Sequence, residues 1–429
     1  MMRIMELKRT LNLFDATSIG IGAIIGAGIF VVLGIATGYA GPSVIVSMVI
    51  AGIVASFTAF SFAELGSAIP REGGAYAFAY ELVSPVVAFV VGCLWLFAQV
   101  VAGAAISLGF AGYFVTILPI LPVKIIAVLV AATLTGLNIV GIKQSANVNN
   151  ILVLTKIAIL CLFVGFGIFR IDFQNFSSFS PNGIFGILEG AGFIFFAYLG
   201  FGRIATLGEE VKNPQRTLPL SILLALTISI VIYILTGFTT TGLQDYRVLA
   251  QSGSPLADAA KATGNLVLVA VVSLGALIAT VSVLLTNLIG LSRVSFAMAR
   301  EGQLPKTAAK ISSRFGTPYI SILVMGAITV FLPLILDLKQ TVAMTSFGIL
   351  STHVVVNLSA IRLRKKMPHS TTFRAPFYPL IPLLGILSCI ILMFSLPEES
   401  WIVAAVIVTA SASFYFLKSK RRPKGLVRH

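Results

Sequence analysis

The residues of this sequence that could do chemistry are few, and the most concentrated group is a run of glycines in an apolar stretch. The stretch IGIGAIIGAGIF, at 19–30, has glycines at four of its twelve positions. If the helix unwinds at Gly26-Ala27-Gly28, backbone N–H groups of its second half lose their partners and present the positive end of a helix dipole, which suits a carboxylate. Carbonyl groups that end the first half, near Ile24, suit an ammonium group. One broken helix thus offers donors and acceptors without a charged side chain.

The same glycines have two other interpretations. Gly22 and Gly26 match the small-xxx-small spacing at which membrane helices pack closely, and such packing can coexist with a break. A dinucleotide-binding loop would need a preceding strand and an acidic residue about 20 residues further on. The next carboxylate, Glu64, lies 36 residues beyond Gly28, so this class of site is excluded.

Lys156 stands near the middle of another apolar segment, LVLTKIAIL. A cation at the centre of a membrane helix costs roughly 2.5–3.5 kcal/mol on insertion scales, so such a residue is a functional candidate by default. It lies too far from either end of the segment for its side chain to reach the membrane surface. A purely structural polar contact is the alternative interpretation.

Two carboxylates also lie in apolar segments. Glu64 lies near one end of its segment, which favours a gate, or a bond to a loop N–H, over substrate contact. Glu189 would either line an outer vestibule or have no role. The three histidines are far apart in the sequence, and no nucleophile–base pair or metal-ligand spacing is present. We therefore expect neither an enzyme nor a metal or other cofactor.

The elements that position these residues follow from composition. The 429 residues are 57% hydrophobic and only 10% charged, whereas soluble domains carry about 25% charged residues. This balance excludes a soluble enzyme, and disorder would need low hydrophobicity. It predicts an all-α integral membrane protein with about twelve transmembrane helices. Segments of about 20 or more apolar residues, the length that a membrane helix needs, are expected at 13–40, 44–69, 85–117, 123–142, 151–169, 184–208, 218–242, 264–299, 318–336, 340–360, 378–396 and 401–417.

The distribution of basic residues predicts the orientation. Of 30 Lys and Arg, 24 fall on the side of the two termini, five fall on the opposite side, and only Lys156 lies inside a span by this division. Cytoplasmic loops carry such an excess, so residues 1–12 and the basic tail 418–429 are expected in the cytoplasm. The net charge of +15 therefore needs no nucleic acid. A cluster in the tenth connection is read as a topology signal, with binding of anionic lipid as the weaker option; its members are Arg362, Arg364, Lys365 and Lys366.

A second glycine-interrupted stretch, FFAYLGFG, lies in the sixth span. Interruptions at equivalent positions of two halves indicate a transporter site near the bilayer midplane. They divide the chain into five-helix repeats at 13–169 and 184–360, inverted relative to each other because each has an odd number of helices. Helices 11 and 12 follow at 378–417.

At this point the sequence resembles the amino acid–polyamine–organocation (APC) superfamily of transporters, in particular proton-coupled amino acid permeases with the leucine-transporter fold. The resemblance covers about 10–380 and is carried by IGIGAIIGAGIF, FAELGSAIPREGGAYAF, FFAYLGFG, GEEVKNPQRTLP, AMAREGQLPK and FRAPFYP. GEEVKNPQRTLP, after the sixth span, is the most specific of these motifs.

The resemblance implies a bound amino acid between spans 1 and 6. Its carboxylate would meet the N–H groups of Gly26, Ala27 and Gly28, and its ammonium group the carbonyls of Ile24, Phe196, Ala197 and Leu199. Phe196 would also close over the substrate, unless it is an ordinary packing residue. Glu209 and Glu210 would latch the inner gate.

The resemblance also implies a role for Lys156. Its ammonium group would replace the metal ion of sodium-coupled relatives and couple transport to protons. Candidate partners are Ile21, Gly22, Thr280 and Ser282.

Two departures from the family bear on the substrate. Gly202 and Arg203 stand where many relatives have an acid, and the third span has no carboxylate near Ala98 or Gln99. A site for cationic amino acids or polyamines is therefore disfavoured. We expect uptake of neutral amino acids across the cytoplasmic membrane by alternating access, with an exchanger, a cationic amino acid or polyamine transporter, and a transporter-fold sensor as alternatives. The oligomeric state is not predicted.

Overall fold

The computed structural model describes residues 9–70, 73–141, 146–208, 210–312, 314–368 and 372–420. Within these ranges the chain is helical, and its only strand-like pairing is an isolated parallel bridge between Leu11 and Val211. Helices lie at all twelve predicted spans. In the described residues, nine helical stretches are long and apolar enough to cross a membrane, and the first of them contains two predicted spans. Two further apolar helices, at spans 9 and 11, are shorter.

The first five spans include the break expected in span 1 and add one loop helix to the prediction. Their elements are α1 (Leu13–Ile24), the π-helical turn η1 (Gly28–Val32), α2 (Leu33–Ala40), α3 (Val44–Ala68), the loop helix α4 (Ala75–Leu82), α5 (Pro85–Ile117), α6 (Val123–Val140) and α7 (Ala146–Gly167).

The remaining spans likewise include one divided helix and short helices in a connection. Their elements are α8 (Gly183–Ile194), the 3-10 helix η5 (Phe195–Leu207), α9 (Pro214–Leu243), the connecting helices α10 (Tyr246–Gln251) and α11 (Pro255–Ala262), α12 (Leu266–Arg300), α13 (Tyr319–Ile335), α14 (Leu338–Lys366), α15 (Leu380–Phe394) and α16 (Glu398–Lys420).

Several helices begin at a polar residue that satisfies free backbone donors. Asn12 caps α1: its side chain accepts from the Asp15 N–H, and the Asp15 carboxylate accepts from the Asn12 N–H. Asp337 and Gln340 form the same reciprocal pair at the start of α14. Such a capping box satisfies two orphan donors, so the first span begins close to its predicted residue 13.

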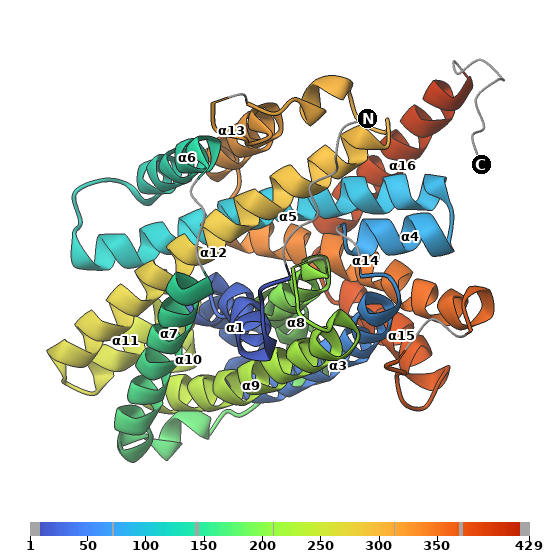
Figure 1. Ribbon diagram of the computed structural model, residues 1–429. Coiled ribbons are helices and arrows are strands. Elements are labelled where there is room, and N and C mark those ends of the chain that lie inside the picture. The colour runs from blue at the N-terminus through green and yellow to red at the C-terminus, as the bar shows by residue number, and fades with distance from the viewer. Residues whose placement is uncertain are drawn as a thin grey trace.

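Packing places the two divided helices together. α1 lies inside the bundle and contacts η5, α7 and α9 (Figure 1). α5 packs across α12 and α14, whereas α6 and α13 pair at one edge (Figure 1). The two glycine-interrupted spans are therefore neighbours, as a shared site requires. The division into repeats at 13–169 and 184–360, followed by 378–417, stays a prediction.

Several segments meet at one end of the bundle, which we call the N-terminal face. The N–H groups of Thr10 and Leu11 donate to the Glu210 carbonyl at 3.0 and 3.1 Å. The Lys418 Nζ, near the end of α16, donates to the Gly302 carbonyl at 2.8 Å, just after α12. Both described chain ends thus lie on the face formed by the ends of η5 and α12. Residues 1–8 and 421–429 of the predicted termini lie outside the described residues.

Candidate functional site

The first span breaks beside the predicted glycines, and the break begins at Ile25, one residue before Gly26. α1 ends at Ile24, and Ile25 has extended backbone angles of φ −74° and ψ 98°. The N–H groups of Gly26 and Ala27 donate to no backbone carbonyl of the described residues, and the N-cap position of η1 is an alanine, whose side chain cannot cap the turn. Backbone donors are thus left free at the break, as a site for an anionic group requires.

The sixth span changes its helix type instead of unwinding. α8 gives way at Phe195 to η5, a 3-10 helix of 13 residues. Because 3-10 hydrogen bonds have poorer geometry than α-helical ones, runs longer than three or four residues are uncommon. The stretch FFAYLGFG is therefore a loosened helix, and its carbonyl groups are held less firmly than those of an α-helix.

The two divided helices touch through their glycines. A Cβ atom placed on Gly28 would overlap the Cα and Cβ of Ala197, and one on Gly200 would overlap the backbone of Ala23 and Ile24. Only residues without a side chain permit this approach. The structure therefore brings the predicted binding segments into direct backbone contact.

Tyr233, on α9, ties the two segments together. Its hydroxyl donates to the Ile24 carbonyl at 2.7 Å and to the Ala197 carbonyl at 3.2 Å. Both oxygens were predicted to receive the substrate ammonium group. In this closed arrangement a neutral hydroxyl occupies the place of that donor, and sequence reasoning did not identify Tyr233.

The predicted binding residues lie together at this contact. Six of them are buried, namely Ile24, Gly26, Ala27, Gly28, Phe196 and Ala197, and Leu199 is partly buried. Phe196 is 7% exposed, so its position is compatible with either a lid or a packing residue. Its lid role stays a prediction.

Lys156 reaches the break from α7. Its Nζ donates to the Gly22 carbonyl at 3.1 Å and to the Ile25 carbonyl at 3.0 Å, and the residue is 1% exposed. These are the last carbonyls before the break, which lack helical partners. The predicted bond to Gly22 is present. The Ile21 carbonyl accepts the Ile25 N–H instead, so a bond from Lys156 to Ile21 stays a prediction.

The hydroxyl partners proposed for Lys156 bond within their own helix instead. Thr280 donates to the Ala276 carbonyl at 2.7 Å, and Ser282 donates to the Ala279 carbonyl at 3.0 Å. Neither contacts the lysine in this structure. Lys156 therefore links span 5 to span 1 through backbone oxygens alone.

Arg203 corrects the prediction that only Lys156 is a cation inside a span. It lies within η5, and its guanidinium donates to the Thr286 Oγ1 at 3.1 Å and to the Gln99 Oε1 at 3.2 Å. It was assigned to a loop because it stands near the end of the apolar segment. The signal that could have identified it is its place only seven residues after the Phe196 position.

A buried ion pair joins three elements on the N-terminal face. The Glu64 carboxylate, 1% exposed, accepts from the Arg364 Nε at 2.6 Å and Nη2 at 3.0 Å, and from the Ala375 N–H at 2.9 Å. The Arg364 guanidinium also lies over the Tyr378 ring, 4.1 Å from its centroid. The bond to a loop N–H predicted for Glu64 is present. Arg364 is more than a topology signal, because it pairs α14 with α3.

We expect Glu64→Gln to lower thermal stability. The substitution leaves the guanidinium of Arg364, which is 24% exposed, without its charge partner. Removing one member of a buried pair costs about 3 kcal/mol. Melting of the purified protein in detergent measures the effect, and Glu64→Leu combined with Arg364→Met should recover part of the loss. An unchanged melting temperature of Glu64→Gln would show that the pair does not hold these elements together.

The loop after η5 meets the N-terminal segment. Besides the bonds from Thr10 and Leu11, the Leu11 carbonyl accepts the Lys212 N–H at 2.8 Å, and the Glu210 carboxylate lies 3.6 Å from the Arg293 guanidinium. Exposed ion pairs contribute little stability, so backbone pairing carries this contact. A latch role for Glu210 stays a prediction, and Glu209 lies outside the described residues.

Glu189 lines a cavity of about 780 Å³ at the end of the bundle opposite the N-terminal face. The cavity is bounded by α2, α8, α14 and the turn between α15 and α16, and Asp337, Lys339, Glu398 and Glu399 also line it. Acidic groups therefore outnumber basic ones in it. Glu189 is only partly buried and has a position from which it can attract cations into the cavity.

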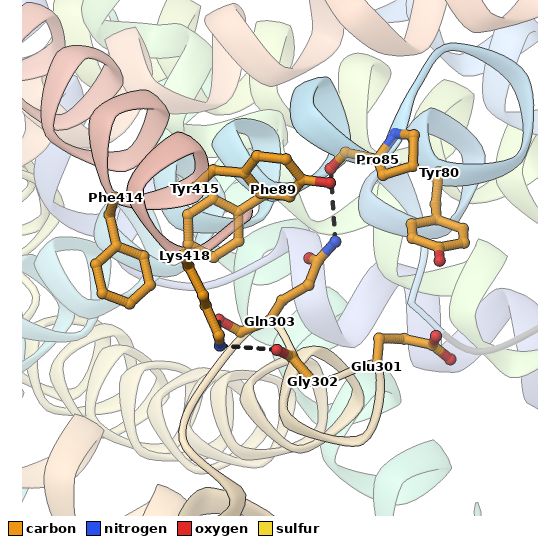
Figure 2. Close-up of a pocket in the computed structure, with 9 residues that line it drawn as sticks. All are labelled: Tyr80, Pro85, Phe89, Glu301, Gly302, Gln303, Phe414, Tyr415 and Lys418. Carbon is orange, nitrogen blue, oxygen red and sulfur yellow. Dashed lines mark hydrogen bonds between the residues drawn. The ribbon is translucent and has the colours of Figure 1, made fainter. Parts of the chain in front are cut away.

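A smaller cavity lies on the N-terminal face, away from the helix breaks. Figure 2 shows Tyr80, Phe89, Tyr415 and Lys418 around it, and its volume is about 90 Å³. None of the predicted binding residues lines this cavity. Neither cavity coincides with the contact between Gly28 and Ala197, which is closed in this structure.

Comparison with known proteins identifies the family. Residues 15–413 match the amino acid permease family. This chain belongs to that family. It is 34% identical to a methylthioribose transporter of Bacillus subtilis (97% of this chain, 94% of the relative). It is 32% identical to a branched-chain amino acid permease of the same organism (98% and 95%) and 29% identical to cationic amino acid transporter 1 of Arabidopsis thaliana (98% and 75%).

The permease is thus a multi-pass membrane transporter and not an enzyme. The superfamily resemblance inferred from the six motifs is confirmed. The names of these relatives give different substrates: methylthioribose, branched-chain amino acids and cationic amino acids. Membership in the family therefore does not determine the substrate of this chain.

Proposed function

We propose that this permease takes up neutral amino acids across the cytoplasmic membrane by alternating access, driven by the proton gradient. The observation that carries the proposal is the Lys156 ammonium group on the Gly22 and Ile25 carbonyls, directly before the break in span 1. A proton that enters or leaves this group changes how firmly α7 holds α1. A gradient can therefore act on the helix that carries the binding site.

The substrate site is proposed at the contact of the two divided helices. The free N–H groups of Gly26 and Ala27, with that of Gly28, would bind the amino acid carboxylate. The ammonium group would bind the carbonyls of Ile24, Phe196, Ala197 and Leu199. The Tyr233 hydroxyl already bonds two of these oxygens, so the ammonium group would either share them with Tyr233, through their second lone pairs, or replace it.

Orientation follows from the basic residues. The N-terminal face carries both described chain ends, and the connections on its side hold most of the Lys and Arg. Such an excess marks cytoplasmic loops. We propose that the N-terminal face is cytoplasmic and that the Glu189 cavity opens outward.

Competition for uptake tests the substrate class. Purified protein in liposomes, with an inward proton gradient, should accumulate a labelled neutral amino acid. Unlabelled neutral amino acids should compete better than arginine or putrescine, because no carboxylate among the described residues lies at the helix breaks to bind a second cation. The reverse order would assign the permease to cationic substrates, and counterflow without dependence on the gradient would make it an exchanger.

A further inference from the structure

Arg203 places a positive charge inside the bundle, and no carboxylate of the described residues pairs with it. The side chain is only partly exposed. Taking a guanidinium group out of water is costly unless a partner compensates its charge. A chain that keeps such a group beside its transport site is expected to use it toward a ligand.

The surroundings of Arg203 hold unused hydrogen-bonding capacity. A guanidinium has five N–H donors, and among the described residues the side chain bonds only Thr286 and Gln99. The Gln99 Oε1 also accepts from the Asn287 Nδ2 at 2.6 Å. The Asn287 side chain is 1% exposed, and its Oδ1 has no partner among the described residues. The cluster Gln99, Arg203, Thr286 and Asn287 therefore combines spare donors with an unpaired buried acceptor.

This cluster borders the proposed substrate site. A Cβ on Gly26 would overlap Val283 of α12, so Val283 touches the break. Thr286 and Asn287 follow Val283 by three and four residues, which places them on the same helix face one turn on, about 5 Å away. Thr286 and Asn287 are closer to the N-terminal face than Val283 is. Arg293 follows Thr286 by seven residues, so these side chains form a row along one face of α12.

The row is also accessible. Thr286 and Arg203 are partly exposed, and Arg293 is exposed, whereas Val283 is 6% exposed. This face of α12 is directed toward η5 and the loop after it. Thr286 accepts a hydrogen bond from Arg203 of η5, and Arg293 pairs with Glu210 of that loop. The exposed part of this face of α12 thus begins at Thr286, one turn after Val283.

We propose that Gln99, Arg203, Thr286 and Asn287 form a side-chain subsite of the transport site, which takes a hydrogen-bond acceptor on the substrate and opposes a cation. The acceptor is a carboxylate, carboxamide or hydroxyl group, so polar neutral and acidic amino acids are preferred over purely apolar ones. This inference rests on the proposed transport of amino acids: it favours polar side chains within the neutral class and adds acidic amino acids to the expected substrates. A carboxylate matches the two parallel N–H groups of the guanidinium with two acceptor oxygens, whereas a carboxamide or hydroxyl group offers one acceptor oxygen.

The test compares competitors in wild type and in Arg203→Met. Uptake into liposomes uses labelled leucine or labelled asparagine, whichever the wild type accumulates, with unlabelled leucine, asparagine, aspartate and arginine as competitors. Asparagine and aspartate should inhibit at concentrations about 10- to 100-fold lower than leucine, the range expected for a hydrogen bond to a charged group. Arg203→Met should erase this advantage, and inhibition by leucine should change little.

Two further variants show which property of Arg203 acts. Arg203→Lys keeps the charge and loses the fork, so it should retain part of the preference for aspartate and less of that for asparagine. Arg300→Met removes a cation at the end of the same α12 helix and should keep the wild-type order. Melting in detergent checks that each variant is folded.

The outcomes separate the subsite from other roles. An unchanged competitor order in Arg203→Met would overturn the subsite. Loss of leucine and asparagine uptake together in folded Arg203→Met would also overturn it, because Arg203 would then be a tie between α5, η5 and α12. A wild type that accumulates no amino acid would instead contradict the proposed function itself.

Discussion

Lys156→Ala should reduce proton-driven accumulation of substrate to background while leaving substrate binding measurable. The substitution removes the ammonium group from the Gly22 and Ile25 carbonyls and leaves both oxygens unpaired in a buried place. In the proposed mechanism the protonated lysine holds α7 to α1 and favours the outward-open state, and loss of the proton to the cytoplasm releases α1. A ligand drives a conformational equilibrium only through a difference in its interaction with the two states. Without the Lys156 amine, the proton no longer binds differently to the two states, so the gradient cannot shift the equilibrium between them.

The measurement is uptake into liposomes under an inward proton gradient, a sodium gradient or no gradient, beside equilibrium binding. Lys124→Ala is the matched control, because Lys124 is exposed and donates to the Leu334 carbonyl at 3.1 Å, its one recorded partner in the described part of the chain. It should transport as wild type does. Accumulation by Lys156→Ala equal to wild type would remove this residue from the mechanism. Sodium dependence of the wild type would indicate a metal site in its place.

Gly28→Val should abolish substrate binding. A Cβ at this position already overlaps Ala197, so a branched side chain must push the two divided helices apart. Overpacking of this kind costs about 1–3 kcal/mol, and more where backbone has to move. The side chain would also cover the N–H groups proposed to bind the carboxylate. Binding should weaken at least roughly tenfold, the equivalent of 1.4 kcal/mol.

Equilibrium binding of labelled substrate in detergent measures this effect. Gly136→Val is the control, because a Cβ on Gly136 meets no atom within 4 Å and the residue is exposed on α6. Its affinity should match wild type, which separates a local clash from a general intolerance of valine. Wild-type affinity in Gly28→Val would exclude the span 1 break from the binding site.

The sequence was sufficient for features that follow from local composition. Apolar segments predicted twelve helical spans, and glycine spacing predicted the interruption after Ile24. Lys156 was identifiable because a lysine in the middle of an apolar segment has few structural explanations. Its carbonyl partner Gly22 followed from the family resemblance.

Features that depend on contacts between distant segments were not predictable. Tyr233 is one of ten tyrosines and has no local signal, yet it meets two carbonyls from different spans. Arg203 stands near the end of an apolar segment, where a basic residue usually marks a loop. Only the hydrogen bonds from its guanidinium to Thr286 of α12 and Gln99 of α5 show that the side chain points into the bundle. Arg364 likewise lies in a basic cluster whose other members gave no reason to single it out.

Two of the helices, α13 and α15, are shorter than the hydrocarbon layer of a membrane. α13 has 17 residues and α15 has 15, so they extend about 25 and 22 Å. The hydrocarbon layer is about 30 Å thick. α15 turns large apolar side chains such as Leu387 and Phe394 outward, and α13 does so with Phe331 and Ile335. A short hydrophobic stretch is accommodated where lipid thins, where flanking side chains reach the membrane surface or where chains associate. Bilayers of shorter acyl chains should therefore fit these two helices with less deformation.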